Sequence, residues 1–267
     1  MIIYWKINFN YIERNYKVDC LFVVIIGLVI GSFLNVCIFR IPEEQSICFP
    51  PSHCTSCQHQ LGVLDLIPVL SYVFLGGRCR YCKENISIRY PLIEVLNGFF
   101  YLIIYFRFGF SIFTLKYFIL TSLLIVISMI DFDTQDVYTS TIMFGAVVGI
   151  VFLSIHQFIL KEEGLNFIFG GIAGAVIIGI IVFVTRGMGE GDIEIAGVCG
   201  LFLGVKGILI ALFLGIIIGG IAAISILLLK IKNSKDRIAF GPFIAIGTII
   251  SMLYGNEILN AYLSLLY

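Results

Sequence analysis

Long, uninterrupted apolar runs dominate the chain. They lie at residues 18–39, 91–106, 112–130, 138–160, 166–185, 193–205, 207–229 and 239–265. None of them alternates apolar with polar residues as a barrel strand does, so each predicts a helix. Because a membrane-spanning helix needs about 20 apolar residues, the pattern predicts an all-α polytopic membrane protein with about eight transmembrane helices. Glycine clusters at 170–174 and 215–220 predict close contacts between such helices.

The only long polar segment lies between the first two runs, and it divides the chain. We expect an N-terminal tail over 1–17, a first transmembrane helix over 18–39, a polar loop over 40–90 and a membrane core over 91–267. We expect no cleavable signal peptide, because a charged tail precedes the first run and no small-residue cleavage site ends it. Within the loop, residues 64–75 are apolar but too few to span a membrane, so we expect them at the interface.

Composition excludes several classes of protein. Of the 267 residues, 60% are hydrophobic and 13% are charged, whereas an ordinary soluble domain has about 25% charged residues. The charged side chains are too few to form the polar surface of a soluble protein. A soluble enzyme, a disordered chain and a nucleic-acid binder are therefore excluded, and membrane lipid is the expected partner of most of the surface.

The formal net charge is zero, but the charges are unevenly placed. With eight spans, the loops near 40–90, 131–137, 186–192 and 230–238 share one side of the membrane. That side holds ten basic residues, which are Arg40, Arg78, Arg80, Lys83, Arg89, Arg186, Lys230, Lys232, Lys235 and Arg237. The opposite loops hold only Arg107, Lys116, Lys161 and Lys206. This excess predicts that the polar loop faces the cytoplasm.

Acidic residues stand at the ends of two spans. Asp131, Asp133 and Asp136 follow the run that ends at Ile130, and Asp192 closes the sequence Gly-Met-Gly-Glu-Gly-Asp at 187–192. Carboxylates in such places are costly unless they face a wet cavity or each other. Two spans separate Asp131 from Asp192, so both side chains emerge on the same face and meet if their helices pack together.

Such a pair of carboxylates carries a recognisable chemistry. Two carboxylates that share a site hold one proton between them near neutral pH. The ionised member can take a proton from water while the protonated member donates one to a substrate carbonyl, as in aspartic proteases. Gly189 and Gly191 would let the backbone approach closely and take positive φ. The competing interpretation is that the acids only end helices in contact with water. We favour it for Asp133 and Asp136, and residue types alone leave it open for the other two.

Four of the eight cysteines form two Cys-x-x-Cys pairs, Cys54 with Cys57 and Cys79 with Cys82. Two such pairs in one loop predict a tetrahedral zinc site with four cysteine ligands. The loop has few large apolar residues, so metal would supply its folding energy, and a cytoplasmic loop disfavours disulfides. Redox dithiols and free thiols are the alternatives. We expect neither neighbouring histidine as a ligand and expect packing roles for the other cysteines, which concerns His53, His59, Cys20, Cys37, Cys48 and Cys199.

Five segments form a distinctive set in their order along the chain. They are GSFLNV at 31–36 with RIP at 40–42, the cysteine tetrad, DLIPVLSY at 65–72 with ISIRYPLIE at 86–94, GMGEGD at 187–192, and FGPF at 240–243. Together they resemble the bacterial type IV prepilin peptidases (prepilin leader peptidase/N-methyltransferases), which are GxGD intramembrane aspartic peptidases. The resemblance covers residues 27–247, nearly the whole chain.

The resemblance implies a function and a set of residues. Members cleave the short basic leader of type IV prepilins or pseudopilins after a glycine, at the cytoplasmic face of the bacterial plasma (inner) membrane. Most then N-methylate the new first residue with S-adenosylmethionine, and they serve piliation, competence and type II secretion. Asp131 matches the first catalytic aspartate and Asp192 the second, supported by Gly189 and Gly191. The tetrad matches a structural zinc site, Glu94 stands where a methylation-linked acid is expected, and the peptidase step needs no cofactor.

The sequence departs from the family pattern at two places near these acids. Val137 and Tyr138 stand where the family has Ile-Pro or Leu-Pro, which puts the start of the next helix in doubt. Glu194 stands where the family has lysine, and an acid there raises the local negative charge. We expect activity to survive if Glu194 points away from Asp192.

Two other classes of function follow from the residues. A membrane thiol–disulfide oxidoreductase built on the two Cys-x-x-Cys pairs predicts reversible disulfides in a periplasmic loop, and the basic character of the loop argues against that side. A transporter or assembly scaffold with paired carboxylates predicts acids deeper in the spans and leaves the GxGD glycines without a purpose. No glycine-rich nucleotide loop is visible, so methylation rests on the resemblance alone.

Overall fold

The computed structural model describes residues 9–160, 164–185, 187–229 and 239–266. These residues are almost entirely helical and form no strand. The long helices are α1 (Phe9–Arg40), α3 (Arg89–Phe108), α4 (Ile112–Thr134), α5 (Thr139–Ile155), α6 (Leu165–Thr185), α7 (Gly191–Leu228) and α8 (Gly241–Leu266). A π-helical turn, His156–Leu160, extends α5. The all-α polytopic class predicted from the apolar runs is confirmed.

The described residues contain seven segments long and apolar enough to cross a membrane when α7 is counted as one. α7 covers two of the eight predicted runs, 193–205 and 207–229, as two helices that meet at a break. The backbone leaves the helical conformation only at Gly204, at φ 72° and ψ 179°. Next to this break, the N–H of Val205 donates a hydrogen bond to Oδ1 of Asn166 at 3.4 Å. A single glycine therefore interrupts the helix where the sequence predicted the boundary between two spans.

The chain divides into two compact units. Unit 1 comprises Met1–Arg40 and Glu44–Phe118, and unit 2 comprises Ile41–Glu43 and Ile119–Tyr267. The division falls inside α4, so this one helix contributes its first turns to unit 1 and the rest to unit 2. Each unit has its own packed interior.

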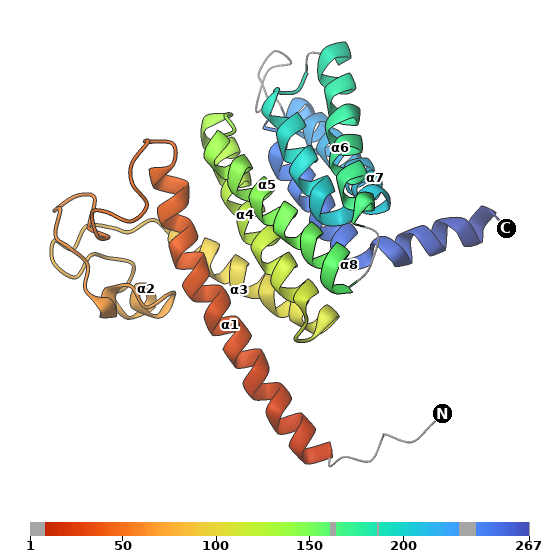
Figure 1. The fold of residues 1–267 in the computed structure, drawn as a ribbon. Helices are drawn as coiled ribbons and strands as arrows, with labels where there is room; N and C mark the ends of the chain where they lie inside the picture. The colour runs from red at the N-terminus through yellow and green to blue at the C-terminus, as the bar shows by residue number, and fades with distance from the viewer. Residues whose placement is uncertain (1–8, 161–163, 186, 230–238, 267) are drawn as a thin grey trace. The chain divides into compact units, whose positions relative to one another are not determined.

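In unit 1, α1 packs against α3 (Figure 1). The two helices approach each other closely at Gly31, where an added Cβ would lie only 2.7 Å from Cα of Glu94. The absence of a side chain at this residue makes the close contact possible. The buried Asn97 side chain donates to the carbonyl of Gly27 at 2.7 Å. Tyr101 and Phe118 stack with ring centroids 3.9 Å apart. The contact places Glu94 beside the end of α1 that leads into the polar loop.

The polar loop of unit 1 holds the stretch 64–75 that we expect at the membrane interface. It contains a 3-10 turn, Val63–Asp65, and the short helix α2 (Leu70–Phe74). Within the stretch, the side chains of Leu64 and Phe74 are 66% and 84% exposed. A segment at the membrane interface buries its apolar side chains among lipid headgroups and acyl chains. Apolar side chains that the protein itself leaves exposed are therefore consistent with such a position.

In unit 2, α6 runs alongside α7, and α7 packs against α8 (Figure 1). The predicted glycine contacts are present here. A Cβ at Gly170 would lie 2.5 Å from the carbonyl oxygen of Gly200, and a Cβ at Gly215 would lie 2.9 Å from that of Phe243. Gly220, at the end of the second cluster, meets nothing within 4 Å, so that residue is not a packing position.

Part of the charge pattern lies beyond the described residues. Arg186, Lys230, Lys232, Lys235, Arg237 and Lys161 belong to segments outside them. The sidedness of the loops is therefore an inference from the sequence and from the positive-inside rule.

Candidate active site

Asp131 lies in the last turn of α4 and is only 5% exposed. Its Oδ2 accepts a hydrogen bond from the backbone N–H of Gly241 at 2.8 Å. Gly241 is the first residue of α8, and a helix N-terminus presents free N–H groups and a partial positive charge to an anion. The end of α8 thus fixes the position of the Asp131 carboxylate.

Asp192 lies in the first turn of α7 and is also 5% exposed. Its Oδ2 accepts a hydrogen bond from the backbone N–H of Gly189 at 3.0 Å. This contact folds the residues before α7 back over the carboxylate. Each of the two aspartates is therefore shielded, and each is held by one main-chain donor.

Packing within unit 2 brings the two aspartates into one site. A Cβ at Gly241 would lie 2.6 Å from Oδ2 of Asp131 and 3.1 Å from Cδ1 of Ile195, so α8 begins against both α4 and α7. A Cβ at Gly191 would lie 2.5 Å from Cγ2 of Val137. The Asp131 carboxylate also lies near enough to Asp192 for its charge to act on that residue. The ends of α4, α7 and α8 that carry these groups therefore lie together, and the joint action of the two acids stays a prediction.

The glycines before Asp192 are only partly as expected. Gly191 does allow the backbone to approach Val137 closely. Positive φ was also expected, but in the described chain the glycines with positive φ are Gly76, Gly77, Gly109 and Gly204. Gly189 serves instead through its N–H, which any residue except proline supplies.

The other acids near the pair are exposed, although the charge of Asp136 still acts on Asp131. Asp133, Asp136 and Glu194 are exposed, whereas Asp192 and Ile195 on the same turn of α7 as Glu194 are buried. The departure at Val137 and Tyr138 also leaves the fold intact, because α5 begins at Thr139 with Tyr138 as its extended N-cap residue. Neither departure from the family pattern disturbs the pair.

The four cysteines of the polar loop gather in unit 1. Their Sγ atoms all lie within 4.8 Å of one another, and those of Cys54 and Cys82 are 3.8 Å apart. Four sulfurs at about 2.3 Å from a tetrahedral zinc ion would be about 3.8 Å apart, so the donor set fits zinc. Among the described residues, neither His53 nor His59 belongs to the cluster, as expected.

The two Cys-x-x-Cys turns are copies of one structure. The N–H of Gln58 donates to the carbonyl of Cys54 at 2.9 Å, and the N–H of Lys83 donates to that of Cys79 at 3.1 Å. Both Gln58 and Lys83 have positive φ, at 58° and 64°. A β-bridge closes each turn, between His53 and Gln60 and between Arg78 and Asn85. The loop therefore contains a short structural repeat that the sequence pattern did not reveal.

The thiols of this cluster differ in acidity. The hydrogen bond from the backbone N–H of Cys57 is the main effect that lowers the pKa of Cys54 to about 6. The backbone N–H of Glu84 acts to lower the pKa of Cys82, but burial and hydrogen bonds to the other thiols together raise it to about 12. Cys54 is therefore the more readily ionised of these two thiols, and metal binding would displace the protons that the ligand thiols carry.

The other cysteines are free thiols, as all eight are. Cys37 and Cys199 are buried and Cys20 is half-buried, which fits the expected packing role. Cys48 is exposed, so the packing role expected for it is wrong. It lies in an irregular part of the loop, where no neighbouring helix covers it.

Two family models match the chain, the Bacterial Peptidase A24 N-terminal domain over residues 25–108 and the Type IV leader peptidase family over residues 118–224. Curated proteins named prepilin leader peptidase/N-methyltransferase, from Pseudomonas putida and Bacillus subtilis (strain 168), are 30% and 31% identical to it. The alignments cover 91% and 90% of this chain and 93% and 96% of those relatives. The chain belongs to the type IV leader peptidase family. No solved structure matches it.

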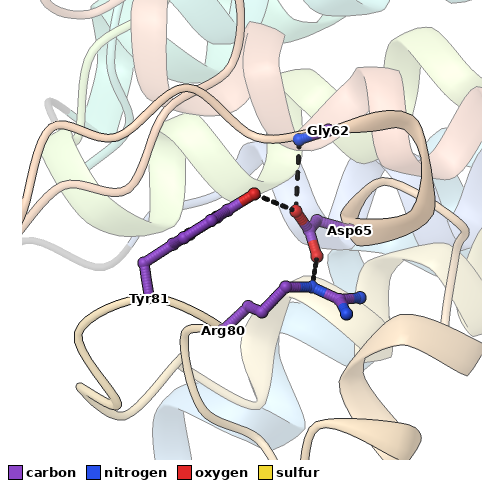
Figure 2. A network of polar contacts seen from close by, with 4 residues as sticks. All are labelled: Gly62, Asp65, Arg80 and Tyr81. Atoms are coloured by element: carbon purple, nitrogen blue, oxygen red, sulfur yellow. Dashed lines mark hydrogen bonds and ion pairs between the residues drawn. The ribbon is translucent and has the colours of Figure 1, made fainter.

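In this member of the leader peptidase family, unit 1 also contains a network around Asp65 (Figure 2). Nε of Arg80 donates to Oδ1 at 2.6 Å, while the N–H of Gly62 and the hydroxyl of Tyr81 donate to Oδ2 at 3.1 and 3.4 Å. The Arg80 hydrogen bond is the main cause that lowers the pKa of Asp65. Because Arg80 and Tyr81 lie between Cys79 and Cys82, the second cysteine turn holds this carboxylate.

Glu94 belongs to the same region of unit 1. It is 8% exposed, its Oε2 accepts the backbone N–H of Val69 at 2.7 Å, and it also interacts with the hydroxyl of Ser32. Together with Asp65 it lines a cavity of about 620 Å³ between the loop and the ends of α1 and α3. The sequence marked Glu94 only by resemblance, and nothing in the pattern predicted the cavity.

Proposed function

We propose that this chain cleaves the leader peptide of type IV prepilins or pseudopilins after a glycine, with Asp131 and Asp192 as its catalytic pair. Membership of the leader peptidase family gives the reaction class. The observation that carries the residue assignment is the pair itself, two shielded carboxylates in one site at the ends of α4 and α7, each held by a main-chain N–H.

The chemistry needs only these two groups and a water molecule. The ionised carboxylate takes a proton from water while the oxygen of that water bonds to the scissile carbonyl carbon. The protonated carboxylate donates its proton to the carbonyl oxygen, which gives a neutral diol. The diol then collapses: the carboxylate that gave up its proton takes one from a diol hydroxyl, the C–N bond breaks, and the leaving amine receives a proton from the acid formed in the first step. The pair returns to its starting state with no metal in the sequence of steps.

The N-methylation of the new N-terminus is the second part of the proposed function. The relatives are named as N-methyltransferases, and S-adenosylmethionine is the cofactor that would supply an electrophilic methyl group. We assign zinc a structural role at Cys54, Cys57, Cys79 and Cys82, because the cluster closes on itself with four sulfurs and a closed set of four thiolates leaves no open position for substrate. We place the enzyme in the bacterial plasma (inner) membrane with both activities facing the cytoplasm, on the basis of the basic loops.

Leader cleavage by variants of the full-length protein tests the assignment. We expect Asp131→Asn and Asp192→Asn each to abolish cleavage of a co-expressed prepilin, because each removes one member of the pair while keeping the size of the side chain. Asp133→Asn is the matched control, since Asp133 is exposed and should keep cleaving. Robust cleavage by either of the first two variants, inserted in the membrane at normal levels, would contradict the assignment.

The thiol oxidoreductase alternative has no support from the relatives, whose names describe peptidases and methyltransferases. The cysteine turns also favour metal over redox chemistry, because four thiols converge rather than two. Metal analysis of the purified protein separates the two: zinc on the tetrad excludes a dithiol, and a reversible disulfide between paired cysteines would support one.

A further inference from the structure

One hydroxyl beside the proposed catalytic pair has no partner in the fold. Ser128 lies in α4 three residues before Asp131. Its Oγ is shielded from solvent and has no hydrogen-bond partner among the described residues. A buried hydroxyl without a partner is costly, so such a group in a native structure calls for an explanation. Its place, one helical turn from a catalytic carboxylate, indicates that the reacting site supplies the partner.

Other hydroxyls in the transmembrane helices are satisfied by their own backbone. Four of them donate to the carbonyl four residues earlier at 2.7–2.9 Å, and these are Thr134, Ser154, Thr185 and Ser225. Such a bond back to the helix is the usual way in which a serine or threonine within a helix pairs its hydroxyl. Ser128 makes no bond of this kind. Its hydroxyl is therefore available to a group outside the backbone of α4.

The Asp131 carboxylate has one oxygen that can accept a further donor. Its Oδ2 accepts the N–H of Gly241 at 2.8 Å, whereas no described residue donates to its Oδ1. An ionised carboxylate accepts hydrogen bonds on both oxygens. Residues three apart are neighbours on the surface of a helix, and a helical side chain leans over the turn that precedes it. The carboxylate of Asp131 therefore leans towards the turn that carries Ser128.

We propose that the Ser128 hydroxyl donates to Oδ1 of Asp131 when a prepilin occupies the site, and so holds the carboxylate that takes the proton from water. This inference rests on the proposed leader cleavage and assigns the roles within the pair. A carboxylate that accepts donors on both oxygens is ionised and acts as the base, which leaves Asp192 as the acid. Catalytic hydrogen bonds are often long before substrate binds and tighten in the complex.

Ser128 keeps its own proton throughout the reaction. Asp131 takes a proton from water as the water oxygen bonds to the scissile carbonyl carbon, and Asp192 gives its proton to the carbonyl oxygen. The hydroxyl of Ser128 fixes the direction in which the Asp131 oxygens face the water, and a small error in that direction is costly. Ser128 is thus a positioning residue that acts through Asp131.

Steady-state cleavage of a purified prepilin by the full-length protein tests the proposal. Ser128→Ala removes the hydroxyl and keeps the residue small. We expect kcat to fall about tenfold or more with KM unchanged, because Asp131 acts on the scissile bond. The midpoint of thermal unfolding should not fall, since the hydroxyl has no partner in the protein without substrate. Ser128→Thr, which keeps a hydroxyl on the same carbon, should retain most of the wild-type kcat.

Thr121→Val is the matched control. Thr121 lies on the same face of α4, two turns before Ser128, and its buried hydroxyl also has no partner among the described residues. It is about 15 Å along the helix from Asp131, too far to touch the carboxylate. This variant removes the same kind of hydroxyl and should keep the wild-type kcat.

The possible results each decide the question. A Ser128→Ala enzyme with kcat within about twofold of wild type would overturn the proposal and leave Ser128 as a small packing residue. An equal loss in Thr121→Val, or a loss that accompanies a lower unfolding midpoint, would assign the effect to packing and overturn it as well. So would a stably folded Ser128→Thr that is no more active than Ser128→Ala. Cleavage by Asp131→Asn would instead refute the catalytic pair itself, whatever Ser128 does.

Discussion

Replacing Gly241 with alanine tests whether the Asp131 carboxylate must be held in place for leader cleavage. The Gly241 N–H donates to Oδ2 of Asp131 at 2.8 Å. A Cβ at this position would lie 2.6 Å from that same oxygen and 3.1 Å from Cδ1 of Ile195. The first separation is too short for a real Cβ and the second is tight. Because the residue lies at the start of α8, either the carboxylate or the helix must move. In both cases the hydrogen bond lengthens.

The size of the effect follows from the lost interaction. A hydrogen bond to a charged group contributes about 1.5–3 kcal/mol, and about 1.4 kcal/mol is a tenfold change in rate. The kcat for cleavage should therefore fall about 10- to 150-fold. A displacement of about 1 Å in a catalytic group costs on the order of 100-fold, which lies within the same range. KM should change little, because Asp131 acts on the scissile bond and not on the leader.

The assay is the initial rate of leader removal from a purified prepilin, followed by gel shift over a range of substrate concentrations. Gly220→Ala is the matched control, because a Cβ at Gly220 meets nothing within 4 Å. A Gly241→Ala enzyme with kcat within about twofold of wild type would refute the reasoning. So would a variant in which KM rises and kcat stays the same, since that result would assign Gly241 to substrate binding.

Three further predictions concern the metal cluster, the family departure and the helix packing. Cys57→Ser should abolish zinc binding, measured by metal analysis of the purified protein, whereas Cys48→Ser, outside the tetrad, should retain it. Glu194→Gln should leave kcat within about fivefold of wild type, since a surface charge contributes little; a larger loss would show that Glu194 acts on the pair. Gly200→Ala should lower the midpoint of thermal unfolding, because a Cβ there would lie 2.1 Å from a backbone oxygen of α6. Gly197→Ala, whose Cβ would have its nearest neighbour at 3.7 Å, should not lower it.

The helices were predictable because a segment that crosses a membrane can adopt few backbone conformations other than a helix. Backbone groups in hydrocarbon must pair within the chain, so a long apolar run is a helix, and the run at 166–185 became α6 (Leu165–Thr185) almost residue for residue. The boundary predicted between residues 205 and 207 lies next to Gly204, where the backbone leaves the helical conformation, but the sequence did not identify the glycine responsible. A glycine that breaks a helix and a glycine that packs against a neighbour look alike in sequence, and this chain has 27 glycines.

The placement of Asp131 and Asp192 at the same end of their helices was predictable from chain order, because two intervening spans return the chain to the same face. Helix periodicity also explains Glu194. Asp192, Ile195 and Ala196 share the buried face of α7, and position 194 falls on the opposite side. Both features depend only on the regular geometry of helices.

The backbone hydrogen bonds and backbone conformations of the site could not be predicted from the sequence. The Gly241 N–H reaches Asp131 from 110 residues away, and a backbone donor has no residue type that would mark it. Gln58 and Lys83 take positive φ in the two cysteine turns without the glycine that usually signals such a conformation. The cavity beside Glu94 likewise depends on how the loop folds onto α1 and α3, which no periodicity describes.

The use of main-chain donors also explains why the two departures from the family pattern do no visible damage. Gly189 and Gly241 hold the carboxylates through N–H groups, which are present whatever side chains surround them. A changed residue on the outer face of α7, such as Glu194, therefore alters the local field without removing a partner from the pair. The site instead limits the size of the residues at positions 191 and 241. A Cβ at Gly191 would lie 2.5 Å from Val137, and a Cβ at Gly241 would lie 2.6 Å from Asp131. It follows that charge changes near the pair should be tolerated better than the addition of a single methyl group at either glycine.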